Sequence, residues 1–298
     1  MFENINTTEV SDTIKKNTYF HQESAISREQ IHQINSELNL WNFKLNSNEI
    51  LPVKTFNGWF HSMAIARSKT VYDIVTNEKI IGICKNYIGD KFRLKAHRVY
   101  SITSGAKMPW HTDDKAYGVK KDFKGLIFIL YLKDVYKGEF QIIKDSAEIS
   151  KKYDSPKIED SAIQKFHKDK IIDFKSPAGS LIIYDHRAIH RAKPYFDPFW
   201  YRTSLFIQVD NNLADSEKII LNSSFISNMN EDIKKYLGFG MNSGMPHEPT
   251  NTGYKTLSYK LLISIIVKCI FSITLIKPFY LFRRSQILKI LKKLIKKS

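Results

Sequence analysis

The sequence has few cysteines and no sign of a secretory signal at its start. Only two cysteines occur among 298 residues, Cys84 and Cys269, and they lack the paired spacing of a disulfide framework or a zinc knot. A reducing compartment is therefore the simpler interpretation. The first residues carry acids where a secretory signal would carry lysines, and no apolar run follows them. We therefore expect no export through a cleaved signal.

Acidic residues are absent from the C-terminal part, and this absence accounts for most of the net charge. The formal charge is +16, but 11 of the 46 basic residues lie in residues 255–298, which contain no acid. The remainder has 35 basic and 30 acidic residues, so the body of the chain is only weakly basic. Because the body lacks a basic stripe, no nucleic-acid partner is expected.

A long uninterrupted apolar run is also missing. Residues 261–282 are strongly apolar, yet Lys268, Lys277 and Pro278 interrupt them before a span of about 20 residues is complete, so a transmembrane helix is not favoured. Residues 285–297 place leucines and isoleucines on one helical face and lysines on the other. This pattern is typical of a helix lying on an anionic membrane surface. A helix docked on the protein's own core is the alternative.

The N-terminal part contains two helical patterns. Hydrophobic residues make up 43% of the chain, which is sufficient for a core. Residues 1–26 show no sustained period and are expected to form an extended lead-in. A capping-box pattern at Ser27 predicts a helix running to about Leu40. Apolar spacing predicts a second helix over about 70–88.

Beyond residue 93 the sequence changes to short apolar runs separated by Gly, Pro and Asp. The predicted strands are Leu94–Thr103, Gly125–Lys133, Glu139–Ile143, Ile171–Phe174, Ser180–Tyr184 and Trp200–Val209. Many short strands with turn signals predict a mainly β sandwich or barrel with flanking helices. The predicted units are an N-terminal helical region 1–93, a β core 94–210 with a polar insert at about 145–170, an extension 211–254 and the basic tail 255–298.

Three side chains of the β core are candidate metal ligands. His111 stands two residues before Asp113, and side chains at i and i+2 of a strand point to one face, so both can reach the same ion. His190 follows a predicted buried strand, where a distant third ligand should lie. His186 competes for this role, but His190 is nearer the strand of Arg202, and we expect His186 beside the site or exposed. Two imidazoles and one carboxylate leave three positions open, as in non-haem Fe(II) oxygenases.

A charged side chain interrupts the apolar residues of the last predicted strand. Strand alternation places Arg202 and Ser204 on one face, together with Phe206. A buried charge needs an anionic partner, because an unpaired one is costly. A guanidinium fork with a hydroxyl two residues on is well shaped for a carboxylate. The alternative is a structural arginine paired with an Asp or Glu of the protein itself.

The chain resembles the phytanoyl-CoA dioxygenase-like family of Fe(II)/2-oxoglutarate oxygenases over roughly residues 94–210. The matching site residues are His111, Asp113 and His190 for iron and Arg202 and Ser204 for 2-oxoglutarate. The segments 138–146 and 178–185 also resemble the family, the first in its Gly-x-Phe-Gln-x-Ile pattern and the second in the strand before the distal histidine. The chain departs from the family at Asp145 and Ala147, where Gly and His are common.

The resemblance implies a double-stranded β-helix core, the jelly roll of cupins, with helices packed on one sheet. It also implies Fe(II), 2-oxoglutarate and O2 at one site, where 2-oxoglutarate is decarboxylated to succinate and a substrate is hydroxylated. The far carboxylate of 2-oxoglutarate would meet Arg202 and Ser204. Tyr131 could add a hydroxyl to that carboxylate, or it is a core aromatic. Asp113 argues against the halogenase variant, which needs that position vacated.

The expected function is therefore hydroxylation of a small molecule, lipid or cell-envelope saccharide. The expected location is cytoplasmic, peripheral to the inner face of a membrane. One alternative is a jelly-roll binding module without catalysis. Another is a cupin-like isomerase or hydrolase with Zn or Mn at the same ligands. The Arg202-x-Ser204 pair argues against the second alternative, because such enzymes need no further carboxylate anchor. The fold does not identify the substrate.

Overall fold

The structure is a computed structural model. It describes residues 1–38, 53–55, 58–61, 63–103, 108–114, 123–153, 155, 157–197, 199–226 and 229–245. The predicted basic tail 255–298 lies outside the described residues. No helix within the described ranges has the length and apolar character needed to cross a membrane.

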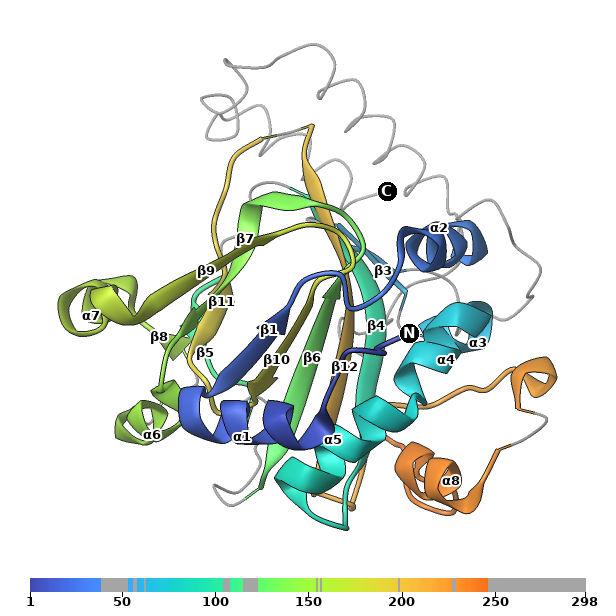
Figure 1. Cartoon of the computed structure of the whole chain (residues 1–298). Helices are drawn as coiled ribbons and strands as arrows, with labels where there is room; N and C mark the ends of the chain where they lie inside the picture. Colours follow the sequence, from blue (N-terminus) through green and yellow to red (C-terminus); the bar gives the residue numbers. More distant parts are fainter. Residues whose placement is uncertain are drawn as a thin grey trace, which may run out of the picture.

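Two antiparallel sheets form the centre of the molecule (Figure 1). The larger sheet contains β1 (Tyr19–Gln22), β2 (Val53–Thr55), β3 (Gly58–His61), β4 (Arg93–Thr103), β6 (Gly125–Tyr131), β10 (Leu181–Asp185) and β12 (Tyr201–Asp210), in the order β1-β10-β6-β12-β4-β3-β2. The smaller sheet contains β5 (Trp110–His111), β7 (Val135–Ile143), β8 (Lys157–Ile158), β9 (Ile171–Ser176) and β11 (His190–Ala192), in the order β8-β5-β11-β7-β9. The predicted mainly β class with flanking helices is confirmed.

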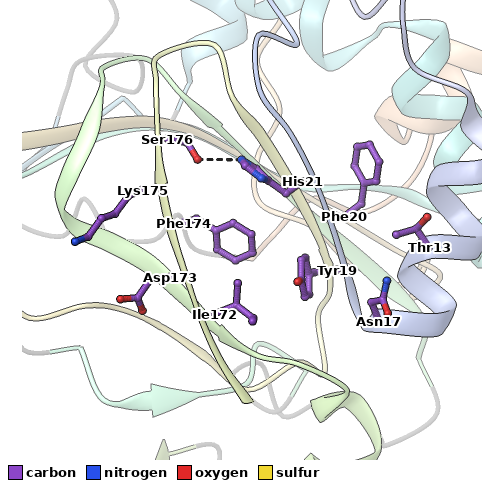
Figure 2. Close-up of a pocket in the computed structure, with 10 residues that line it drawn as sticks. All are labelled: Thr13, Asn17, Tyr19, Phe20, His21, Ile172, Asp173, Phe174, Lys175 and Ser176. Atoms are coloured by element: carbon purple, nitrogen blue, oxygen red, sulfur yellow. Dashed lines mark hydrogen bonds between the residues drawn. The ribbon is translucent and has the colours of Figure 1, made fainter. Parts of the chain in front are cut away.

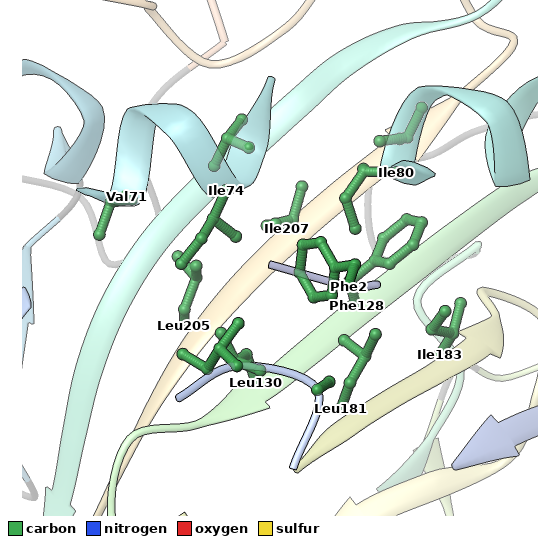
Figure 3. Close-up of a cluster of buried hydrophobic side chains, with 14 of the residues drawn as sticks. Phe2, Val71, Ile74, Ile80, Phe128, Leu130, Leu181, Ile183, Leu205 and Ile207 are labelled. Atoms are coloured by element: carbon green, nitrogen blue, oxygen red, sulfur yellow. The ribbon is translucent and has the colours of Figure 1, made fainter. Parts of the chain in front are cut away.

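Side-chain alternation gives the larger sheet two different faces. On β12, Leu205 and Ile207 join a core that the helices cover, as Figure 3 shows. Phe206 points the opposite way, to a second core shared with the smaller sheet. Full burial of each such aliphatic side chain contributes about 1.5–3 kcal/mol. Since Arg202 and Ser204 share the face of Phe206, both lie between the two sheets.

The outer face of the larger sheet is covered by helices. These are α1 (Thr7–Asn17), α2 (Arg28–Glu37), α4 (Lys69–Val75), α5 (Glu78–Ile88) and α8 (Glu231–Leu237), with the short α3 (Ala64–Arg67) before α4. The capping box predicted at Ser27 is present, with Ser27 and Gln30 bonded reciprocally. The single helix predicted over 70–88 is wrong. Asn77 lies in an extended conformation and caps a new helix by accepting from the backbone N–H of Lys79.

The expectation of an extended lead-in over residues 1–26 is also wrong. The Asn6 side chain accepts from the backbone N–H groups of Thr8 and Glu9 and starts α1. The chain then forms β1, which pairs with β10 at the edge of the larger sheet. Residues 1–93, predicted as helical, therefore supply strands β1, β2 and β3 as well as helices.

The polar insert at about 145–170 is only partly helical. It contains α6 (Ser146–Ile149), the strand β8 and α7 (Asp160–Phe166). β8 pairs with β5, so the insert extends the smaller sheet beside His111. Beyond β12, within the predicted extension 211–254, α8 packs on the covered core through Tyr236 and Leu237.

Candidate metal and carboxylate site

Strand pairing places the two predicted histidine ligands side by side. β11 lies between β5 and β7, and His190 is the register partner of His111 on β5 and of Ile142 on β7. The two imidazole ring centroids are 4.3 Å apart. Residues 79 positions apart in the sequence are thus brought together by one antiparallel pair.

The carboxylate ligand is held by the turn that follows β10. The backbone N–H of Asp113 donates to the carbonyl oxygen of His186 at 2.9 Å, and that of Asp114 donates to the same oxygen at 3.2 Å. The ring of His186 is buried, and its Nε2 lies 2.7 Å from the carbonyl oxygen of Phe123. His186 therefore contacts the site through its backbone, whereas His190 is the imidazole that meets Asp113.

The predicted triad converges on one point. His190 Nε2 lies 3.3 Å from Asp113 Oδ2, and His111 Nε2 lies 3.8 Å from Asp113 Oδ1. One candidate ligand atom from each of the three residues lies within 4.8 Å of the other two. These separations are compatible with a single ion bound at about 2.0–2.2 Å by imidazole nitrogen and carboxylate oxygen.

Backbone carbonyls orient both imidazoles. The Nδ1 of His111 lies 2.9 Å from the carbonyl oxygen of Pro109, and the Nδ1 of His190 lies 2.9 Å from that of Ala188. A carbonyl oxygen only accepts, so each Nδ1 carries a proton and donates it, and this bond directs each Nε2 toward Asp113. Burial, with a smaller effect from His111, lowers the pKa of His190 to about 4 despite the opposing charge of Asp113. His190 is therefore neutral at pH 7.

The donor set fits a divalent transition metal. Two imidazole nitrogens and a carboxylate oxygen face one another within 4.8 Å. Imidazole nitrogen is a preferred ligand of Fe, Zn, Cu and Ni, and carboxylate oxygen completes such sites. Two histidines and one carboxylate with open positions are the ligands of non-haem Fe(II) oxygenases.

A second polar group lies in the same interior, at the start of β12. The side chain of Arg202 is buried, and its Nη1 donates to the carbonyl oxygen of Gly138 at 2.6 Å. Gly138 has a positive φ of 63°, and a Cβ there would lie 2.3 Å from the ring of Tyr195. Glycine is therefore required where the chain presents this carbonyl to Arg202.

Arg202 has no anionic partner among the described residues. The described ion pairs do not include it, and its buried Nε has no hydrogen-bond partner there. Ser204 is fully buried, and its Oγ likewise has no partner within the described ranges. Two unsatisfied polar groups this close are costly unless a ligand satisfies them. The alternative of a structural arginine paired with a protein carboxylate is not seen in this part of the chain.

The hydroxyl of Tyr131 is already engaged by the main chain. It donates to the carbonyl oxygen of Phe174 at 3.1 Å and accepts from the backbone N–H of Phe140 at 3.1 Å. Burial raises the pKa of Tyr131 to about 12, although the charge of Arg202 acts in the opposite direction. Tyr131 thus joins β6, β7 and β9, and one lone pair is left for a ligand.

The sequence did not single out Tyr184, which is the last but one residue of the buried strand β10. Its hydroxyl is 3.2 Å from Asp113 Oδ2 and 3.3 Å from His190 Nε2. Burial raises the pKa of Tyr184, the charge of Asp113 raises it further, and that of Arg202 lowers it. The phenol therefore lies within electrostatic reach of both the triad and Arg202. From the sequence alone, a tyrosine within an apolar strand is predicted to be a core aromatic residue, so nothing marked it as part of the site.

A groove of about 430 Å³ opens elsewhere, between β1 and β9 (Figure 2). Its lining residues are Thr13, Asn17, Tyr19, Phe20, His21, Ile172, Asp173, Phe174, Lys175 and Ser176. The ring centroid of Phe174 is 5.9 Å from that of Phe140, which is 5.3 Å from that of His190. Two aromatic side chains therefore separate the groove from the triad.

Similarity to known proteins is found at the level of structure. No protein-family model matches the chain, and no curated protein has a similar sequence. Solved structures do match. The non-haem α-ketoglutarate-dependent carbocyclase SnoK of nogalamycin biosynthesis is 13% identical, with a TM-score of 0.53 over 70% of this chain and 85% of that one.

The chain shares the fold of 2-oxoglutarate-dependent enzymes. The epimerase SnoN of nogalamycin biosynthesis is 14% identical, with a TM-score of 0.50 over 68% of this chain and 81% of that one. HygX of Streptomyces hygroscopicus, solved with nickel and 2-oxoglutarate bound, is 10% identical, with a TM-score of 0.52 over 72% of this chain and 91% of that one. These likenesses confirm the predicted double-stranded β-helix core.

Proposed function

We propose that the protein is an Fe(II)/2-oxoglutarate-dependent oxygenase. The observation that carries this proposal is that a metal-binding set and a carboxylate-binding set of side chains share the interior between the two sheets. His111, Asp113 and His190 form a metal-binding set, and a buried Arg202 without an anionic partner in the described chain lies on the strand with Ser204. 2-Oxoglutarate has a metal-chelating keto acid at one end and a carboxylate at the other, so it matches both groups.

Each residue has a distinct role in this proposal. His111, Asp113 and His190 would hold the iron, which supplies the redox chemistry that activates dioxygen as 2-oxoglutarate is decarboxylated. Arg202 binds and orients the far carboxylate through its free Nε edge, and Ser204 Oγ donates to the same group. The Gly138 carbonyl fixes the guanidinium by accepting from Nη1. Exclusion of water by the surrounding buried residues strengthens these charge interactions.

We further propose hydroxylation as the outcome, on a small molecule, lipid or cell-envelope saccharide. The support is the resemblance of residues 138–146 and 178–185 to the phytanoyl-CoA dioxygenase-like family. SnoN and SnoK are an epimerase and a carbocyclase on the same fold. The fold itself therefore does not select hydroxylation over other oxidative outcomes.

The test is succinate release from 2-oxoglutarate in the presence of Fe(II) and O2. Wild-type protein should release succinate, and His111→Ala or Asp113→Ala should abolish release because each removes a ligand. The matched control is His32→Ala, since His32 is exposed on α2. Unchanged turnover in either ligand variant would contradict the assignment.

Membrane association of the enzyme is a separate proposal. It rests on the sequence of residues 285–297, where lysines line one helical face and leucine and isoleucine the other. We infer attachment to the inner, anionic face of a membrane, where the substrate would also be met. A cytoplasmic location agrees with the scarcity of cysteine.

A further inference from the structure

Tyr184 places a hydroxyl against two of the three candidate ligands. The phenol is fully buried on β10, and its oxygen lies 3.2 Å from Asp113 Oδ2 and 3.3 Å from His190 Nε2. Its ring is fixed by neighbours on the smaller sheet. The centroid of Tyr184 is 4.9 Å from that of Phe140 and 4.8 Å from that of His190.

The hydroxyl has one proton and two acceptors. The carboxylate of Asp113 only accepts, and Nε2 of His190 accepts because Nδ1 holds the proton that is donated to Ala188. The carboxylate carries the charge, so the Tyr184 proton goes to Asp113 Oδ2. A lone pair of the phenol oxygen then faces the lone pair of His190.

The hydrogen bond gives the two oxygens of Asp113 different surroundings. Oδ2 accepts from the hydroxyl of Tyr184 at 3.2 Å. Oδ1 lies 3.8 Å from His111 Nε2 and makes no bond to the phenol. Oδ1 is therefore the oxygen available to a metal ion between the ligands.

We propose that Tyr184 is a positioning residue of the metal centre, whose hydroxyl holds Asp113 as a one-oxygen ligand and so keeps a coordination position open for the 2-oxoglutarate keto acid. The inference rests on the proposed function. Without this bond the Asp113 carboxylate can rotate and chelate through both oxygens, which closes one of the three open positions. The role concerns the geometry of the site and does not require Tyr184 to react.

The experiment compares Tyr184→Phe with a matched control, Tyr236→Phe. Both changes remove one hydroxyl from a fully buried tyrosine. Tyr236 lies on α8, in the core outside the larger sheet, and its hydroxyl has no hydrogen-bond partner among the described residues. Calorimetry measures Co(II) binding to the full-length protein and then 2-oxoglutarate binding to the Co(II)-loaded form. The visible spectrum of Co(II) reports its coordination, and thermal unfolding without metal reports stability.

For Tyr184→Phe we expect Co(II) to bind with one site, 2-oxoglutarate affinity to fall about tenfold or more, and the Co(II) spectrum to change. Tyr236→Phe should match wild type in Co(II) binding, 2-oxoglutarate affinity and the Co(II) spectrum. A purely structural role for Tyr184 would lower the unfolding temperature and leave the spectrum and the affinity unchanged. That outcome, or wild-type values for Tyr184→Phe in every measurement, would overturn the proposal. If the wild-type protein binds no Co(II), both the proposed function and the role of Tyr184 are contradicted. If the wild-type protein binds Co(II) and 2-oxoglutarate, the Tyr184→Phe result tests the role of Tyr184 alone.

Discussion

Arg202 is the side chain whose surroundings most constrain the function. A guanidinium this deeply buried, bonded by one nitrogen to the Gly138 carbonyl and with a free Nε, is incomplete without an anion. Ser204 two residues further on has an equally unsatisfied hydroxyl. Their position on the inner face of β12, in the interior that contains the triad, makes a metal-bound dicarboxylate the fitting ligand.

Replacing Arg202 should remove 2-oxoglutarate binding while sparing the metal. In Arg202→Gln we expect the Kd for 2-oxoglutarate to rise at least about 100-fold, because two hydrogen bonds to a charged group contribute about 1.5–3 kcal/mol each. Arg202→Lys should recover little, since the ammonium lacks the planar fork. Calorimetry on metal-loaded protein measures this, with Arg28→Gln on the exposed start of α2 as the control. Equal affinity in Arg202→Gln would assign another role to the arginine.

At the scale of elements, the site depends on how β6 and the turn after β10 fit together. The ring of His186 packs on Gly125, where an added Cβ would lie 2.5 Å from its Nδ1. The same turn supplies the carbonyl that holds the backbone of Asp113. Gly125, on a strand that carries none of the three candidate ligands, therefore affects the position of Asp113.

Gly125→Ala should weaken both the fold and the metal site. The clash displaces His186 or Asp210, whose Cβ is 2.9 Å from the added atom, and overpacking of this kind costs about 1–3 kcal/mol. We expect a lower unfolding temperature and weaker metal binding. Gly244→Ala is the control, because the nearest atom to its added Cβ is 3.5 Å away. If Gly125→Ala is destabilised but binds metal as tightly as wild type, the turn after β10 does not control the metal site.

The buried carboxylate of Asp185, at the end of β10, forms an ion pair with the partly exposed Arg187 and a hydrogen bond with Tyr87 of α5. The carboxylate of Asp185 accepts from the guanidinium of Arg187 and from the hydroxyl of Tyr87. Burial alone would raise the pKa of Asp185, but the hydrogen bonds and charge of Arg187 lower it below its ordinary value. Since the pKa is lower in the folded state, the stabilisation is present above the unfolded pKa and is lost as the pH falls through the folded value.

Asp185→Asn should therefore destabilise the protein in a pH-dependent way. Near neutral pH we expect a loss of about 3 kcal/mol, because the variant leaves Arg187 without its buried partner. The difference from wild type should shrink as the pH falls below about 4, where Asp185 of the unfolded chain becomes protonated, and should be smallest below the lower pKa of the folded state. Denaturant unfolding at a series of pH values measures both free energies. A difference that does not depend on pH would show that the charge of Asp185 is not the cause.

At the scale of the whole molecule, the positive charge and the proposed chemistry lie in different parts of the chain. The body through residue 254 is only weakly basic, and the described residues through 245 contain both sheets and the site. The excess of lysine and arginine belongs to residues 255–298. Attachment to an anionic surface and turnover should therefore be separable.

A truncation at about residue 255 should lose binding to anionic vesicles and keep succinate release. The contribution of each lysine near such a surface is about 1 kcal/mol, so binding should also weaken with salt and on neutral vesicles. Vesicle co-sedimentation measures this. The control is a full-length variant with Lys289, Lys292, Lys293 and Lys296 changed to Gln, which retains the apolar stripe. Binding retained after truncation would refute the surface-helix proposal.

The sequence predicted those strands of the fold that have long runs of apolar or alternating residues. Six apolar runs predicted β4, β6, β7, β9, β10 and β12, while β5 and β8 have only two residues each, too few to show alternation. The break at Asn77 was missed because apolar spacing continues across it, although an N-cap residue marks the start of α5. The triad could be predicted because histidine and aspartate are chemically distinctive. Tyr184 could not, since only the fold brings it to Asp113.

The most direct test of the central claim is a titration of 2-oxoglutarate into the anaerobic Fe(II)-loaded protein and into the metal-free protein. We predict one bound 2-oxoglutarate per chain with iron, and binding at least about tenfold weaker without it, because Arg202 and Ser204 then hold only one end of the ligand. Iron binding without any 2-oxoglutarate binding would contradict the account and favour a metal-dependent isomerase or hydrolase. Binding of neither would favour a β-barrel module without catalysis.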